Sequence, residues 1–189
     1  MTEYAAVAFG AITGIALSSA VGFRIFLPFL VTGVAIKLNL LTVAADFAWL
    51  SSWPALAVFA AATVTEVLAY YIPVVDHALD VIGSPAAVVA GTMLTASMVV
   101  GMDEWLRWAL ALIAGGGIAG SLHVGKSLVR GASTATTGGL GNPVVATAEV
   151  FGATIASILA LLVPVIVVGV AVIIMIIAVR KLWRRRRTS

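Results

Sequence analysis

The side chains able to do chemistry are few, and three of them stand in stretches that are otherwise apolar. Arg24 occurs in the segment GFRIFLP, and Glu66 and Glu149 each interrupt a hydrophobic run. An arginine in such surroundings must face protein, a water-filled cavity or an anion, because hydrocarbon cannot solvate its charge. Its planar fork of N–H groups suits carboxylates and phosphates. Arg24 is therefore predicted to bind an anionic substrate, with an internal salt bridge to Glu66 or Glu149 as the alternative.

The two glutamates point to proton chemistry. A carboxylate at membrane depth costs about 2.5–3.5 kcal/mol on insertion scales unless it is paired or protonated. Desolvation favours the protonated form, so that such a group can take up and release a proton during a working cycle. We predict proton coupling at Glu66 and Glu149. The alternative is that each glutamate is simply neutralised by a neighbouring cation or hydroxyl.

Two polar stripes follow these residues at helical spacing, which places the members of each stripe on one helix face. The acidic stripe contains Asp76 and Asp80, and the basic stripe contains His123, Lys126 and Arg130. The acidic stripe is predicted to form a gate or ionic network. The basic stripe, together with Asn142, is predicted to bind substrate. The plain alternative is that the stripes pair with each other to lock helix ends, or face water.

The stretch GSLHVGKS, Gly120 to Ser127, fits the phosphate-binding loop G-x-x-x-x-G-K-[ST] of nucleotide hydrolases. That loop works only between a strand and a helix, where backbone N–H groups and a helix N-terminus converge on the phosphates. Here an apolar run precedes the match, and no strand is predicted. The sequence therefore argues against an ATPase, and an internal duplication explains the match better.

The elements that position these residues are predicted to be membrane helices. Of the 189 residues, 62% are hydrophobic and only 10% are charged, and the mean hydropathy is +1.15. Soluble domains carry about 25% charged residues, and about 20 apolar residues cross a bilayer as a helix. Apolar runs occur at 5–21, 55–72, 86–100, 106–122, 144–163 and 165–179. We predict an all-α polytopic membrane protein of about six transmembrane helices, with broken or re-entrant segments near 22–36 and 125–142.

The two halves of the chain resemble each other. GIALSSAVG (14–22) matches GIAGSLHVG (117–125) at six of nine positions, and weaker matches follow in the same order. Each half holds three predicted crossings, and an odd number forces the second copy to enter the membrane from the opposite side. Many secondary transporters are inverted repeats of this kind, with the substrate site between the halves. We predict one transmembrane domain, 1–182, built from repeats at about 5–101 and 106–182.

Charges and tryptophans predict the orientation of the chain. Six of the eleven Lys and Arg residues lie in RKLWRRRR, residues 180–187, and a basic run beside a membrane helix favours the cytoplasmic face. With six crossings, residues 183–189 form a cytoplasmic tail, and the N-terminus, predicted to be a retained helix, is also cytoplasmic. The tryptophans at the outer boundary are then Trp49, Trp53, Trp105 and Trp108. The expected location is the cell inner membrane.

Three groups of motifs extend along most of the chain: GFRxFLP, then E…A…IPVVDHALD, then H…K…R followed by a Ser/Thr/Gly loop, GNP and E. In these motifs, over roughly residues 8–163, the chain resembles a family of small bacterial integral-membrane proteins that carry a domain of unknown function. It departs from the family pattern at Tyr70 and Tyr71, where an acidic–basic pair is expected. The resemblance implies a polytopic, transporter-like membrane protein and names no substrate.

We therefore predict a secondary transporter that moves an anionic or amphipathic solute and is coupled to protons. A flippase for a phosphorylated lipid would use the same ingredients. The predicted partners are membrane lipid, a small anionic solute or lipid head group, and a second copy in a homodimer; nucleic acid, metal, other cofactors and enzymatic activity are not expected. Two alternatives stay open. One is a Mg²⁺-dependent intramembrane transferase using Asp76 and Asp80, and the other is a membrane assembly protein without transport.

Overall fold

The computed structural model describes residues 3–162, without the side chains of residues 3, 73, 74, 76 and 77. The described residues are helical and contain no strand. In chain order the elements are α1 (Glu3–Phe23), α2 (Phe26–Lys37), the 3-10 helix η1 (Ala45–Ser51), α3 (Trp53–Ala69), α4 (Pro73–Met98), α5 (Glu104–Leu110), the π-helical turn η2 (Ala111–Gly116), α6 (Gly117–Thr137) and a last helix (Asn142–Leu162). The predicted sixth crossing at 165–179 and the basic tail at 183–189 lie outside the described residues.

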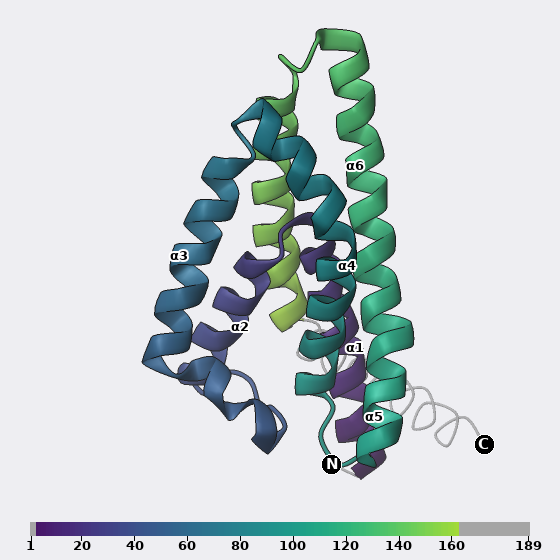
Figure 1. Ribbon diagram of the computed structural model, residues 1–189. Helices are drawn as coiled ribbons and strands as arrows, with labels where there is room; N and C mark the ends of the chain where they lie inside the picture. Colours follow the sequence, from purple (N-terminus) through teal and green to yellow (C-terminus); the bar gives the residue numbers. More distant parts are fainter. Residues whose placement is uncertain (1–2, 163–189) are drawn as a thin grey trace, which may run out of the picture.

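Among the described residues, four helices are long and apolar enough to cross a membrane, and η1 with α3, bent by 63°, counts as a fifth when taken as one span. In Figure 1, α1, α4, α5 and α6 pack together, while α2 and α3 lean away to one side. The prediction of an all-helical polytopic membrane protein is confirmed. The inverted repeat is not confirmed, because α1 and α6, which carry the matching segments 14–22 and 117–125, both pack antiparallel to α4 and so run in the same direction. The repeat boundaries stay predictions.

The first predicted irregular segment is a helix break at which the chain turns back. α1 ends at Phe23, and residues Arg24 and Ile25 leave the helix before α2 begins. Figure 1 shows α2 returning toward the end from which α1 came. Pro28 lies in the first turn of α2, where its missing N–H removes no bond of the helix. α1 and α2 thus form a helical hairpin, which agrees with the break predicted near 22–36.

This reversal places the start of α1 at the same end as the four tryptophans; the side of the membrane that this end faces stays a prediction. Gly10 of α1 lies against the Met98 backbone of α4, and Ala44, beyond α2, donates its N–H to the Ser97 carbonyl at 2.9 Å. The start of α1 therefore lies at the same end as η1 and the α4–α5 turn, which we call the tryptophan end after Trp49, Trp53, Trp105 and Trp108. A cytoplasmic N-terminus and outer tryptophans cannot both be correct, because α1 and α2 together make no net crossing.

The second predicted irregular segment, 125–142, is mostly regular helix. α6 continues to Thr137, and the turn that follows contains Gly138 and Gly139 with φ of +62° and +90°. The hydroxyls that made this segment look unsuited to a helix donate to carbonyls one turn earlier, as Thr134 does to Arg130 at 3.1 Å. Such bonds satisfy Ser and Thr side chains inside a helix. α1 thus breaks after Phe23, whereas α6 runs on through the matching position.

At the tryptophan end an ion pair ties η1 to α5. Arg107 donates to both carboxylate oxygens of Asp46, at 3.1 and 2.7 Å, and the Asp46 side chain is 50% exposed. The Arg107 guanidinium carbon also lies 5.9 Å from the centre of the Phe47 ring. The sequence had given these two charged residues no relation to each other, although they lie 61 residues apart.

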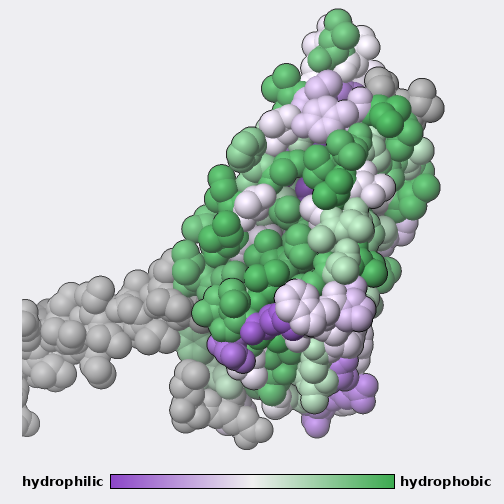
Figure 2. Space-filling model, turned by 90° about the vertical axis from the view of Figure 1, so that its left-hand side faces the viewer, coloured by the Kyte–Doolittle hydropathy of each residue, from purple (hydrophilic) through white to green (hydrophobic). Residues whose placement is uncertain are grey.

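The surface along the helices is apolar. Exposed hydrophobic side chains include Val64 and Leu68 on α3, Val81 on α4, and Leu128 and Val129 on α6. Figure 2 shows a broad hydrophobic band on one face of the molecule, with hydrophilic residues gathered toward its lower end. An apolar surface of this extent is typical of helices that face lipid.

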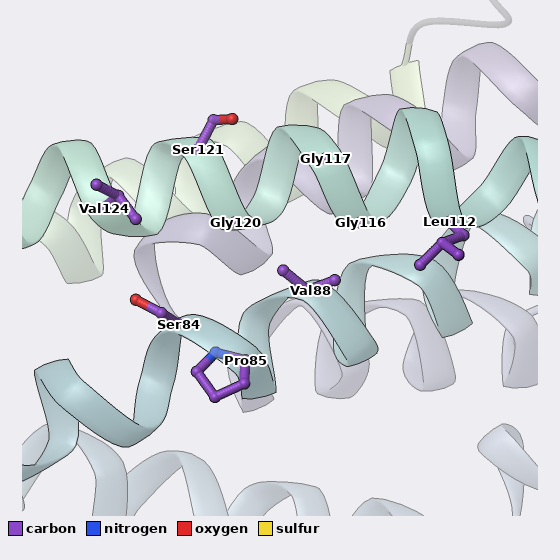
Figure 3. A pocket seen from close by; sticks show the side chains of 9 residues that line it. All are labelled: Ser84, Pro85, Val88, Leu112, Gly116, Gly117, Gly120, Ser121 and Val124. Atoms are coloured by element: carbon purple, nitrogen blue, oxygen red, sulfur yellow. The ribbon is translucent and has the colours of Figure 1, made fainter.

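Glycines let α4 and α6 approach closely. A Cβ on Gly91 would lie 2.5 Å from the Ala119 Cβ, and one on Gly116 would lie 2.5 Å from Thr92 Oγ1. Small residues at helix contacts are typical of membrane bundles. Beside this contact runs a groove of about 670 Å³, lined by apolar side chains, glycines and two serines (Figure 3). Gly117 alone of the GGGIAG glycines faces open space, so this glycine-rich segment packs mainly within its own chain.

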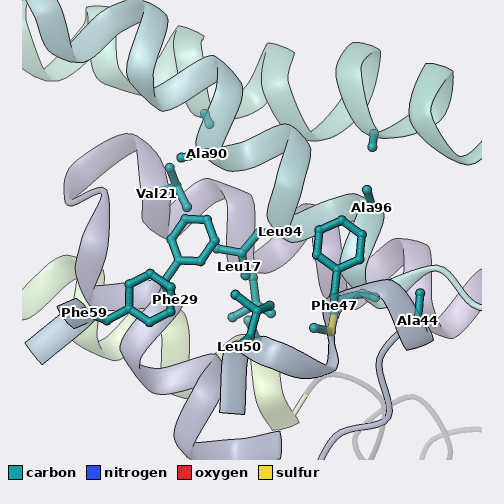
Figure 4. Close-up of a cluster of buried hydrophobic side chains, with 14 of the residues drawn as sticks. Leu17, Val21, Phe29, Ala44, Phe47, Leu50, Phe59, Ala90, Leu94 and Ala96 are labelled. Carbon is teal, nitrogen blue, oxygen red and sulfur yellow. The ribbon is translucent and has the colours of Figure 1, made fainter. Parts of the chain in front are cut away.

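The apolar core lies where α1, α2, η1, α3 and α4 meet (Figure 4). Leu17 and Leu94 are fully buried there, and the Phe29 and Phe59 rings stack with their centres 5.3 Å apart. Between membrane helices such side chains stabilise the fold by close van der Waals packing, because lipid tails are as apolar as they are. The core holds α2 against α3, and this contact fixes where the break at Arg24 lies.

Candidate functional site

Six of the predicted site residues and one further side chain meet in a buried group beside the break between α1 and α2. We call this group the ionic cluster. Its members are Arg24, Glu66, Tyr70, Asp80, Lys126, Arg130 and Glu149. They come from the α1–α2 break, α3 and its end, α4, α6 and the last helix, so that residues far apart in sequence share one site.

Glu149 is shared by two arginines. Arg24 Nη2 lies 3.2 Å from Glu149 Oε2, and Arg130 Nη2 donates to the same oxygen. Arg24 Nη2 also donates to the Ala146 carbonyl at 2.9 Å. The side chains of Arg24, Arg130 and Glu149 are only 1%, 2% and 6% exposed. The internal salt bridge considered for Arg24 is therefore present, with Glu149 as its partner.

Tyr70, directly after α3, brings the three cations together. The guanidinium carbons of Arg24 and Arg130 lie 4.2 and 4.3 Å from the centre of its ring, and Lys126 Nζ lies 4.6 Å from it. These distances are within the range of cation–π attraction. Lys126 also donates to the Tyr70 hydroxyl at 3.1 Å and to the Phe23 carbonyl at 3.0 Å. The lysine of the GSLHVGKS match thus binds the broken end of α1, and it does so from within a helix.

Glu66 is held by backbone N–H groups. Its two carboxylate oxygens accept from Ile25 and Phe26 at 2.9 and 3.2 Å. These N–H groups begin α2, where they have no partner inside the helix and where the helix dipole favours negative charge. Glu66 therefore caps α2 from another helix and fixes the turn that carries Arg24. Glu66 and Glu149, which the sequence treats as equivalent, have different partners.

Asp80 and His123 lie where α4 meets α6. Asp80 Oδ2 is 3.6 Å from Arg130 Nε, so the acidic and basic stripes pair at this point as the plain alternative expected. His123 is fully buried and packs against Gly83, on which a Cβ would lie 2.5 Å from the imidazole Nε2. The absence of a side chain at Gly83 therefore makes the space that the His123 ring occupies.

Asn142 and Asp76 complete the set of predicted residues. Asn142 begins the last helix, and its side-chain amide donates to Thr134 Oγ1 at 3.0 Å, one helical turn beyond Arg130. It therefore lies next to the cluster. Asp76 belongs to α4, but its side chain lies outside the described residues, and its predicted part in a gate stays a prediction.

The cluster lies within the apolar band of the surface. Leu128, between Lys126 and Arg130 on α6, is 70% exposed, and Leu68, between Glu66 and Tyr70 in sequence, is 61% exposed. At this level the molecule thus presents hydrocarbon outward and charge inward. Ionisable residues so placed are costly, and in membrane proteins they mark substrate and proton pathways.

The cluster keeps unused hydrogen-bonding capacity. Arg24 Nε, Arg24 Nη1 and Glu149 Oε1 are buried and bond to none of the described residues. A pocket of about 400 Å³ reaches the cluster between the start of α2, α3 and α4. Glu66 and Tyr70 line it, and the rest of its wall is mainly apolar and includes Phe26 and Ile82. A molecule with an apolar body and one polar group would match this lining.

Sequence reasoning missed Tyr70 as a site residue. Its one signal was its place four residues after Glu66, on the face of the acidic stripe, where a tyrosine is easily taken for a membrane-boundary side chain. It also missed the backbone carbonyls of Phe23 and Ala146, which accept from Lys126 and Arg24. Backbone partners leave no trace in residue types, because every residue carries the same carbonyl.

A family model described as a domain of unknown function (DUF4126) matches residues 11–184, which is most of the chain. This match confirms the family resemblance found in the sequence motifs. No curated protein and no solved structure is detectably similar to the chain.

Proposed function

Because the chain belongs to this family, whose description assigns no activity, we propose a function from the site itself: a secondary transporter that moves an anionic or amphipathic solute together with protons. Arg24, Lys126 and Arg130 bind the anion, with His123 and Asn142 beside them. Glu66 and Glu149 carry the protons. A flippase that moves an anionic lipid between the two leaflets would use the same residues, with a lipid as the solute.

The observation that carries this proposal is Arg24, buried at a helix break with two guanidinium nitrogens that bond to no described residue. An ion pair kept only for stability is replaceable by apolar side chains at little or no cost. A cation with spare donors is instead suited to a ligand that comes and goes. Broken helices beside a buried polar site are the usual construction of substrate sites in transporters.

The shared carboxylate of Glu149 supplies a physical link between protons and anion. While ionised, Glu149 neutralises Arg24 and Arg130 through one oxygen. Protonation would remove that negative charge and leave two guanidinium groups in need of an anion. Solute anion and proton would then enter together, so that the cluster stays near neutrality throughout the cycle.

Flux into proteoliposomes tests this function. Purified protein is reconstituted with a pH-sensitive dye inside the vesicles, and acetate, inorganic phosphate and octyl phosphate are added outside under an inward proton gradient. We expect proton influx with at least one of these anions. Arg24→Gln should reduce it at least tenfold, because a charge-assisted bond contributes about 1.5–3 kcal/mol.

Arg107→Gln is the matched control, since Arg107 lies at the tryptophan end and pairs with Asp46. It should leave flux within about twofold of wild type when reconstitution is equal. Influx that is unaffected by Arg24→Gln, or absent with all three anions, contradicts the proposal.

We further propose that the protein acts as a homodimer in the bacterial inner membrane with its basic tail in the cytoplasm, where anionic lipid favours such a tail. Transport, not catalysis, is proposed because Asp80 pairs with Arg130, which occupies one member of the Asp76/Asp80 pair that a magnesium-dependent transferase would need. Inert vesicles together with capture of a specific membrane complex would favour the assembly role instead.

A further inference from the structure

We propose that the N–H groups of Ile25 and Phe26 are the binding subsite for the oxyanion of the solute, and that the Glu66 carboxylate occupies this subsite as an internal competitor until it is protonated. The inference rests on the proposed function and deepens it. It names the groups that receive the anion, the class of molecule that carries it, and the reason why one proton must accompany each anion.

The first observation is the way in which Glu66 is bound. Each of its oxygens accepts one N–H from the start of α2, at 2.9 Å from Ile25 and 3.2 Å from Phe26. Two adjacent N–H groups that hold two oxygens of one carboxylate form the same geometry that binds free carboxylates, sulfates and phosphates at helix N-termini. α2 has 12 residues and no side-chain cap of its own on its preceding residue. The subsite therefore already holds an oxyanion, one that belongs to the chain.

The second observation is independent of the helix terminus. Arg24 immediately precedes these N–H groups, is 1% exposed, and its Nε and Nη1 bond to no described residue. Arg24 does not itself line the pocket that reaches Glu66, but its guanidinium lies 4.2 Å from the centre of the ring of Tyr70, which does. A carboxylate, which has two oxygens, is satisfied by the two N–H groups alone. A sulfate or phosphate group has further oxygens that suit the spare donors of Arg24.

The third observation is the pocket that leads to Glu66. Its volume of about 400 Å³ matches a small ligand, and Ile25 and Phe26 form part of its wall together with side chains of α3 and α4. Most of the lining is apolar, with Leu79 and Ile82 on one side. A molecule that enters this way therefore carries an apolar chain, and its charged group arrives at Glu66. The solute class that fits is an oxyanion on a hydrocarbon body.

The competition follows from the charges around Glu66. Among the described side chains, the charged and titratable groups on the surrounding elements are Arg24 at the α1–α2 break, Tyr70 after α3, Asp80 on α4, His123, Lys126 and Arg130 on α6, and Glu149 on the last helix. Their three cations are matched by three carboxylates when Glu66 is ionised. An added anion would leave the buried cluster with one excess negative charge, which is costly in a low dielectric. Protonation of Glu66 removes this excess and weakens its hold on the two N–H groups.

Calorimetric titration of the full chain in lipid nanodiscs tests the proposal, with empty nanodiscs subtracted. The probe is octyl sulfate, which stays ionised over the whole pH range used, and inorganic sulfate tests the head group without the chain. For wild type we expect the octyl sulfate affinity to rise about tenfold for each unit by which pH falls, because one proton is taken up per anion bound. Inorganic sulfate should bind at least tenfold more weakly at every pH.

In Glu66→Gln the side chain that occupies the two N–H groups is neutral at every pH. We expect octyl sulfate to bind at high pH at least tenfold more tightly than to wild type, and its affinity to depend on pH much less steeply, with Glu149 as the remaining proton acceptor. Difference infrared spectra should show a protonated carboxyl band on octyl sulfate binding in wild type, and Glu66→Gln should lack it. Glu104→Gln, the same change at an exposed carboxylate of the tryptophan end, should behave as wild type.

Should Glu66→Gln fail to fold, Glu66→Asp replaces it. The shorter side chain keeps a titratable carboxylate but reaches the N–H groups less well, so the pH dependence should persist with tighter binding at high pH. Equal affinity of wild type and Glu66→Gln, a pH dependence as steep in Glu66→Gln as in wild type, or no binding of octyl sulfate overturns the subsite. Inorganic sulfate binding as tightly as octyl sulfate overturns the apolar part of the solute. Binding with proton uptake but without flux would contradict the proposed transport and support the subsite. Anion-dependent flux that is unchanged in Glu66→Gln would support transport and contradict the subsite.

Discussion

The molecule contains two arginine–carboxylate sites that are built in opposite ways. At the tryptophan end, Arg107 and Asp46 meet one to one through two hydrogen bonds, and Asp46 is half exposed. In the ionic cluster, Arg24 and Arg130 converge on one oxygen of Glu149, which is almost fully buried. The first site joins one arginine to one carboxylate and ties η1 to α5, leaving only Arg107 Nε buried without a partner among the described residues. The second costs more free energy to bury and leaves more buried polar atoms without a partner, as expected for the proposed binding site.

The largest effect should come from removing one charge at each site. Glu149→Gln keeps the shape of the side chain but leaves two buried guanidinium groups without their carboxylate, and should lower the free energy of unfolding by about 3–5 kcal/mol. The matched change Asp46→Asn should cost only about 0.2–1 kcal/mol, because water reaches that side chain. Denaturant titration in detergent, followed by helical circular dichroism, measures both. Equal decreases in the free energy of unfolding for the two variants would contradict the difference in burial between the two sites.

A second prediction tests how tightly α4 and α6 pack where Gly83 meets His123, beside the ionic cluster. Gly83→Ala would place a Cβ 2.5 Å from Nε2 of the buried His123, and overpacking of this kind costs about 1–3 kcal/mol. His123→Ala in the same chain should recover part of the loss, because it empties the space. Gly117→Ala, on a helix face with no atom within 4 Å, is the control and should be neutral or slightly stabilising. Thermal unfolding in the same detergent compares the three, and a harmless Gly83→Ala would mean that the two helices separate easily.

The ring beneath each arginine offers a finer comparison. Tyr70 stands under Arg24 and Arg130 and receives a hydrogen bond from Lys126, whereas Phe47 under Arg107 has no hydroxyl. Tyr70→Phe keeps the ring and removes one acceptor, so it should cost about 0.5–1.5 kcal/mol. Unfolding measurements on Tyr70→Phe and Lys126→Met, alone and combined, give the coupling between the two side chains. Strictly additive losses would show that the Lys126–Tyr70 bond contributes nothing.

The smallest effects should come from salt and pH at the tryptophan end. The hydrogen bonds from Arg107 hold the pKa of Asp46 below its usual value. The stability that this pair adds is therefore present above the unfolded-state pKa of Asp46 and is lost as pH falls through the lower folded-state pKa. The difference between wild type and Asp46→Asn should shrink in acid and in high salt, which screens exposed charges. The loss in Glu149→Gln should respond much less to salt, and a similar salt response at both sites would contradict their different burial.

The sequence predicted the helical membrane class, the break at Arg24 and six members of the cluster, because apolar runs and isolated charges are strong local signals. It left open whether the segment near 22–36 is a broken helix or a re-entrant one, since the same apolar residues suit either. It misjudged 125–142, because composition alone does not reveal that Thr134 and its neighbours bond within their own helix. The sequence could not predict the pairing of Glu66 with backbone N–H groups, because residue types carry no signal for a backbone partner.

The hairpin of α1 and α2 has a consequence for biosynthesis. Arg24 leaves the ribosome early, but the Ala146 carbonyl that accepts its hydrogen bond follows 122 residues later. At about 5–20 residues per second, this interval is roughly 6–24 s. Throughout it the guanidinium has to be sheltered by the translocation machinery, by water or by lipid phosphates, and the hairpin can settle only when the final part of the chain has entered the bilayer.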